Sequence, residues 1–157
     1  MPQTNLEILT VGAKVKYCWE TTAGTRPTTG YTELPDVNEA PPISLSTEAI
    51  NVSNISDKIT RYKAGRQDPG GDVNFVLNHT EQVITAWEAL VTAVGTNAGT
   101  GKRLWFEYAY PGATKSFFFA AEPQSLGNVG IAQNANDTIE AHAIVNDVAG
   151  WAAASTT

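Results

Sequence analysis

The chain has 157 residues, a single cysteine and a formal net charge of −6, with 42% hydrophobic and only 17% charged residues. This length predicts one domain, residues 1–157, with a core that needs no disulfide. The acidic balance argues against free nucleic acid or an anionic membrane as a partner. No apolar run reaches the ~20 residues of a membrane span, and the first residues show no secretory signal.

The first predicted strand covers residues 13–19, where Val15, Tyr17 and Trp19 alternate with polar or small side chains. Alternation of this kind is typical of a half-buried strand. Cys18 lies in this strand and fits a protein made in a reducing compartment, where a lone thiol is most often a small packed residue. A second strand is predicted at 43–52, and it leads into a polar segment.

Residues 51–71 form this polar segment, which we call the arm in the sequence. Four of the ten basic residues lie in one nine-residue stretch of this segment, which contains no acidic residue: Lys58, Arg61, Lys63 and Arg66. A charge run of this kind is usually a solvated face. The segment is nevertheless longer than an ordinary hairpin loop and has little to bury, which favours a functional role.

A strand at 72–78 and a helix at 79–94 follow the arm. Val73, Phe75 and Leu77 alternate in the strand, and the helix has apolar residues at helical spacing around Trp87. Asn78 is the expected N-cap, with Glu81 as its capping-box partner, and Gly95 is expected to end the helix.

The loop "GTNAGTGKR" at 95–103 resembles a phosphate-binding loop only superficially. Thr96 stands where that motif needs glycine, and Arg103 stands where it needs serine or threonine. The loop also runs from helix to strand, whereas a phosphate-binding loop runs from strand to helix. We therefore expect a plain flexible connection.

Three further strands are predicted, at 103–110, 115–121 and 138–147, and a turn at Pro111–Gly112 joins the first two. The whole pattern predicts a mainly β (α+β) domain, an antiparallel sandwich or barrel-like sheet with one flanking helix. In "FFF" at 117–119, Phe118 must point away from its two neighbours. Unless both faces are covered, it is an exposed aromatic that marks a partner surface.

Catalytic and metal-binding patterns are missing from the sequence. Cys18, His79 and His142 are dispersed and have no local signature, so neither a thiol dyad nor a zinc site is expected. Asp68 and Asp137 stand among Asn and Gly residues, which leaves a weak calcium loop open, although the ladder of acidic ligands is missing. We predict no enzyme activity and no cofactor.

Charges are segregated along the chain. Between Arg26 and Lys58 there are five acidic residues and no basic one, and after Lys115 there are four acidic residues and again no basic one. A basic arm on a body with acidic patches suits head-to-tail self-association.

The order of these segments resembles the major tail tube protein of long-tailed bacteriophages. The resemblance is carried by "KVKYCWE", by the arm with Tyr62, Gly65 and Asp68 read as a closing Tyr-x-x-Gly-x-x-Asp turn, by the Val73-x-Phe75 strand, and by the helix. It is strongest over 43–94. It implies a subunit of hexameric rings stacked into a tube, with an acidic lumen through which DNA passes without specific binding.

The resemblance also implies a location and partners. The protein would be made in the cytoplasm of a bacterial host and reside in the virion, beside tape measure, terminator and distal tail proteins. The arm would then reach neighbouring subunits, with these interface candidates: Lys58, Arg61, Tyr62, Lys63, Arg66, Asp68 and Phe118. The alternatives are another tail or secretion-tube component, such as a terminator, a tip protein or a type VI-like tube, and a monomeric carbohydrate-binding β-sandwich.

Overall fold

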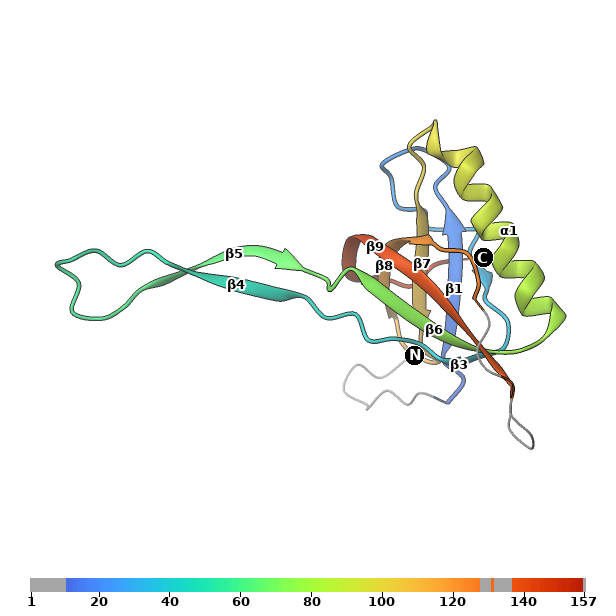
Figure 1. Ribbon diagram of the computed structural model, residues 1–157. Coiled ribbons are helices and arrows are strands. Elements are labelled where there is room, and N and C mark those ends of the chain that lie inside the picture. Colours follow the sequence, from blue (N-terminus) through green and yellow to red (C-terminus); the bar gives the residue numbers. More distant parts are fainter. Residues whose placement is uncertain (1–10, 128–130, 132–136, 157) are drawn as a thin grey trace.

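A seven-stranded antiparallel sheet forms the body of the molecule, and a two-stranded hairpin projects far from it (Figure 1). The structure, a computed structural model, describes residues 11–127, 131 and 137–156. In spatial order the sheet strands are β2 (Thr32–Glu33), β1 (Lys14–Trp19), β7 (Leu104–Ala109), β8 (Lys115–Pro123), β9 (Thr138–Ala153), β6 (Asp72–Asn78) and β3 (Val37–Glu39). The hairpin consists of β4 (Ser46–Asn51) and β5 (Tyr62–Asp68).

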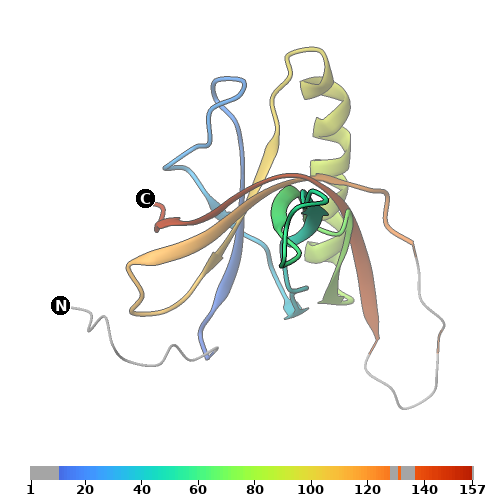
Figure 2. The same cartoon turned by 90° about the vertical axis from the view of Figure 1, so that its left-hand side faces the viewer.

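The sheet curls into a half-barrel because its two longest strands bend. The pairing of β8 with β9 shifts register twice, between Phe118 and Phe119 and between Ala120 and Ala121. Such bulges bend a strand and increase its twist. Gly150 at the bent end of β9 has a φ of 80°, a backbone conformation that side chains disfavour. Figure 2, seen along the hairpin, shows the resulting curvature of β9.

The main core lies between the concave face of the sheet and the single helix α1 (Glu81–Ala98). Phe75, Phe106 and Phe119 come from three strands, and their rings stack with centroids 5.3 and 5.4 Å apart. Trp87 of α1 lies over them, fully buried, 6.4 Å from the Phe106 ring. The predicted mainly β fold with one flanking helix is thus confirmed, in the form of one curled sheet.

The helix differs from its prediction at both ends. Asn78 cannot cap it, because this residue still belongs to β6 and its backbone N–H donates to the Asp36 carbonyl at 2.9 Å. Thr80 is the N-cap, and its hydroxyl accepts from the Val83 N–H at 3.2 Å. The helix also runs through Gly95 and ends at Ala98, with Gly99 as its C-cap. A single glycine within a helix lowers the stability of that helix by only about 1 kcal/mol, and Gly95 does not terminate α1.

The strands at 13–19, 72–78, 103–110 and 115–121 are confirmed to within a residue or two. Strand β9 extends to Ala153, well past the predicted 147. Strands β2 and β3 were not predicted, because two or three residues are too few to show alternation. The Pro111–Gly112 turn is confirmed: Gly112 has a φ of 75°, and the Ala113 N–H donates to the Tyr110 carbonyl at 3.2 Å.

Phe118 points away from Phe117 and Phe119, as predicted, but it is not exposed. It is fully buried in a second cluster with Trp105 and Ala120 on the convex face of the sheet. The ring of Tyr31 packs against Phe118 in a T-shaped arrangement with ring centroids 5.8 Å apart, and the guanidinium of Arg26 lies 4.2 Å from the Phe118 centroid. The exposure on which the interface role of Phe118 rested is therefore absent, because the loop after β1 covers it.

A buried carboxylate, Glu20, holds this cover in place through Gly24. Glu20 accepts from the Arg103 N–H at 2.9 Å, the indole N–H of Trp105 at 2.9 Å and the Gly24 N–H at 3.1 Å. Glu107, also buried, accepts from the backbone N–H and the hydroxyl of Ser155. Burial alone raises the pKa of Glu20, but these hydrogen bonds outweigh it and leave the pKa below its ordinary value.

Candidate functional site

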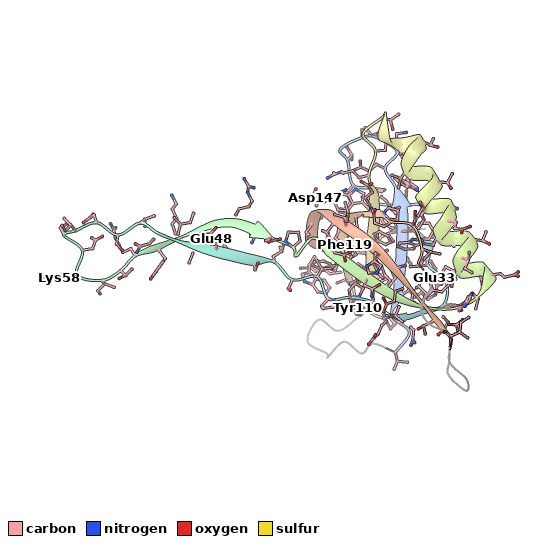
Figure 3. The ribbon with its side chains drawn as sticks, in the orientation of Figure 1. Glu33, Glu48, Lys58, Tyr110, Phe119 and Asp147 are labelled. Atoms are coloured by element: carbon pink, nitrogen blue, oxygen red, sulfur yellow. The ribbon has the colours of Figure 1, made fainter. Side chains whose placement is uncertain are left out.

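The projecting hairpin, β4 and β5 with the loop at 52–61 between them, is the candidate functional site. We call it the arm from here on; it spans residues 46–68, so it begins five residues before the predicted segment. Asn51 pairs with Tyr62 and Ser46 with Asp68 at its two ends. In Figure 3, Lys58 marks its far end and Glu48 its middle. Among the residues that the structure describes, the arm pairs only with itself and contributes to neither buried cluster.

The expected Tyr-x-x-Gly-x-x-Asp turn is not a turn. Tyr62, Gly65 and Asp68 all lie within strand β5. The chain turns only afterwards, at Gly70 and Gly71, which have φ angles of 94° and 78°. Asp68 contributes to this later turn, because its carboxylate accepts from the Gly70 N–H at 2.8 Å.

Gly65 nevertheless has a structural role in the arm. It lies opposite the register shift between Thr47 and Ala49. A Cβ atom at this position would come within 2.9 Å of the Ile50 side chain and 3.2 Å of the Glu48 carbonyl oxygen. Glycine is therefore needed here because the two strands approach closely, a common reason for glycine at a bulge.

The loop at the tip is ordered by its own side chains. The Asp57 carboxylate accepts from the Asn54 N–H at 2.8 Å and from the Arg61 side chain at 3.1 Å. The Asn54 side chain in turn accepts from the Ser56 N–H and hydroxyl. The Ser53 hydroxyl also accepts from the Arg61 N–H at 2.6 Å. These hydrogen bonds within the loop hold the tip in a defined shape.

The arm is less basic than its sequence indicated. As folded, it brings Glu48, Asp57 and Asp68 together with the four basic residues, which leaves a net charge of +1. Arg61 is also engaged, since its guanidinium forms the ion pair with Asp57. Among the described residues, the other three basic side chains of the arm have no ion-pair partner: Lys58, Lys63 and Arg66.

Exposed apolar side chains are the feature of the arm that the sequence analysis missed. Ile55 is fully exposed, Ile59 is 79% exposed and Tyr62 is 64% exposed, and Ile50 and Val52 are about half exposed. Monomeric proteins rarely expose this many large apolar side chains on one projecting element. The sequence signal for these exposed side chains was the recurrence of aliphatic residues in a segment that was not predicted to contribute to the core. Of the predicted interface residues, those on the arm are all exposed and lie together.

The dispersed reactive side chains do not form a site. The Cys18 thiol contacts the Trp19 and Thr29 carbonyls, and burial raises its pKa, which makes it a poor nucleophile at neutral pH. His79 pairs with Asp137 at the start of α1, and His142 lies 3.4 Å from Asp72. Within the described residues, no group of three or more His, Cys, Asp or Glu side chains is placed to hold a metal ion.

Of the comparisons with known proteins, the one with solved structures bears on this fold. No family model matches the chain, and no curated protein sequence matches it. Among solved structures, it is similar to a chain in the six-fold symmetrised cryo-EM structure of the anti-feeding prophage baseplate. The TM-score is 0.55 and the identity is 8%, over 94% of this chain and 95% of that one. The two chains share a fold.

One further observation concerns membranes. In the part of the chain that the structure describes, no helix combines the length and the apolar character that a membrane crossing requires.

Proposed function

We propose that this protein is a structural subunit of a phage-tail-like particle that assembles into stacked hexameric rings and so forms a tail tube. The observation that carries the proposal is the arm, which projects from a complete body and exposes aliphatic side chains to solvent. An ordered element whose apolar side chains no described part of the chain covers is expected to be buried by another molecule.

The shared fold supports the same role. The similar chain belongs to a phage-tail-like baseplate whose structure has six-fold symmetry, and the similarity covers nearly the whole length of both chains. A particle of this kind is built by repeated contacts between subunits. We propose on this basis that the role is structural and not enzymatic, and that other tail proteins contact the ends of the assembly.

The net charge of −6 fits a conduit for DNA, because an acidic lumen does not retain an anionic cargo. In this proposal the protein is made in the host cell, becomes part of the virion, and lines the path of DNA ejection. The alternative structural role, a baseplate or tube-end component, is favoured by the baseplate origin of the similar chain.

Electron microscopy of the purified protein at rising concentration tests the proposal. A tube subunit forms rings and then hollow tubes, whereas a baseplate or tube-end component forms rings that do not stack. A variant with Ile55→Ser and Ile59→Ser should remain folded by circular dichroism and form neither. A protein that stays monomeric at all concentrations, with the wild-type arm intact, would refute self-assembly.

A further inference from the structure

A groove of about 670 Å³ opens on the body, between the adjoining ends of β1 and β7 and the connection from β3 to the arm. One wall is aromatic: Trp151 packs against Phe117 with ring centroids 5.4 Å apart and against Tyr110 at 6.1 Å. Trp151 is 58% exposed even so. Half-exposed tryptophan in a concave aromatic site is typical of a surface that a partner completes.

The opposite wall of the groove is fixed in place. It is formed by the connection at 40–43, which contains Pro41 and Pro42. The Tyr108 hydroxyl donates to the Pro41 carbonyl at 2.7 Å and ties this connection to β7. Because the groove is held open by the fold, a ligand need not order it on binding.

We propose that this groove receives the tip of the arm from a second copy of the chain, with Ile55 and Ile59 against the aromatic wall. The inference rests on the proposed self-assembly and names the surface that the arm engages. In Figure 3 the arm extends away from the body, with Lys58 at its far end and Tyr110 on the body itself. The tip therefore cannot enter its own groove, and the occupant comes from another molecule.

The chemistry of the two surfaces matches. The tip offers two exposed isoleucines on a loop already ordered by Asp57 and its partners, so little freedom is lost on docking. Lys58, between them in the sequence, has no ion-pair partner among the described residues. Glu39 in the groove is likewise unpaired there, whereas the other charge in the groove, Lys14, is neutralised by Glu33 at 3.5 Å. The pair Lys58 and Glu39 fixes the direction of docking.

This contact is head-to-tail, because the tip and the groove are different surfaces of one chain. A contact of this type closes into a ring or continues as a filament. In a closed ring, the arm of each subunit is docked and the groove of each subunit is occupied.

Complementary variants test the inference in the full chain. The arm variant carries Ile55→Ser and Ile59→Ser, and the groove variant carries Trp151→Gln. Each alone should sediment as a monomer, but an equimolar mixture should give a 1:1 complex, because one intact arm meets one intact groove. Ala13→Glu serves as a second groove variant, since Ala13 is exposed, lines the groove and has no core role. Ile144→Ser, which removes an exposed isoleucine elsewhere, should associate like wild type.

Cross-linking separates this inference from the proposed function. In a Cys18→Ser background, Ile55→Cys in one population should form a disulfide-linked dimer with Ala40→Cys in another, because Ala40 lines the groove. It should not do so with Glu88→Cys on the exposed face of α1. If tubes form but only Glu88→Cys cross-links, or the groove variants assemble normally, the arm docks elsewhere and the inference is overturned. If the dimer forms with Ala40→Cys but tubes never do, the inference stands and the tube function fails.

Discussion

At the scale of single residues, Trp87 connects the helix to the sheet. Its ring is fully buried over Phe75 and Phe106, and its indole N–H donates to the Gln124 carbonyl at 2.8 Å. This carbonyl belongs to the segment that follows β8. The residue therefore combines a large apolar burial with a satisfied polar group, which is the usual condition for a buried tryptophan.

Trp87→Ala should lower the free energy of unfolding by about 3–5 kcal/mol, because it removes a large buried side chain and leaves a cavity. Trp87→Phe keeps most of the packing but leaves the Gln124 carbonyl without its donor, and should cost about 1–3 kcal/mol. Urea denaturation measures both. A loss below about 1 kcal/mol for the alanine variant would contradict the assigned packing.

Glu20 gives a pH dependence of known sign. Because its pKa is lower in the folded than in the unfolded chain, its contribution to stability is present above the unfolded pKa of about 4.3. That contribution is lost as the pH falls through the folded pKa. Glu20→Gln should therefore destabilise the protein most at pH 7, and the difference from wild type should shrink below about pH 4. Equal differences at pH 7 and pH 3 in denaturant melts would show that the carboxylate charge has no role.

At the scale of elements, prediction from sequence succeeded where side chains alternate against one core. β6 shows this best: Val73, Phe75 and Leu77 are buried, as their spacing indicates. The prediction failed at the start of α1, where Thr80 and not Asn78 is the N-cap. Asn78 belongs to β6 and donates to the Asp36 carbonyl, a long-range hydrogen bond that leaves no signal in the local sequence. The cover over Phe118 was missed for the same reason, since it comes from residues about 90 positions away.

The arm shows the same limit on the prediction of sites. Its basic residues were identified from local composition, and they do lie on one projecting element. The pairing of β4 with β5 brings Glu48 beside them, which composition within nine positions could not reveal. Asp57 and Asp68 lie just outside those nine positions in the sequence. The exposed isoleucines were visible in the sequence, but only the isolation of the hairpin shows that no described residue covers them.

The isolation of the arm predicts its hydrogen exchange. A two-stranded hairpin without a supporting layer is marginally stable, so amides of 46–68 should exchange faster than those of β6 in dilute protein. After assembly, the same amides should become protected, because docking covers the segment and suppresses the local opening of the hairpin. Mass spectrometry of exchanged peptides makes the comparison, with β6 as the internal reference. Equal protection of the arm in both states would make it an ordinary intramolecular element.

At the scale of the whole molecule, charge should control the rate of assembly. Lys58→Glu with Lys63→Glu reverses two arm charges that have no ion-pair partner among the described residues. This should slow tube growth by roughly tenfold or more, because opposite charges accelerate the encounter of subunits. Raising the salt concentration should slow the wild type as well, since exposed charges more than ~8 Å apart are screened at physiological ionic strength. Light scattering follows the growth.

The matched control reverses two lysines on the body, Lys16→Glu with Lys102→Glu, which changes the net charge by the same amount. Both variants should keep the wild-type circular dichroism, because neither pair lies in the core. If the arm variant and the control grow at the same rate, total charge governs assembly and the position of the charge does not. Assembly would then depend on the apolar side chains of the arm alone.

Because β4 and β5 pair with each other and not with the sheet of the body, the length of the arm can change without a change in the body. Each residue pair added to or removed from β4 and β5 moves the tip by about 3.3 Å, and no atom of the seven-stranded body has to adjust. Selection can therefore alter the distance at which one molecule reaches the next while the body stays unchanged. In the proposed assembly, the span of the hairpin sets the spacing between neighbouring subunits.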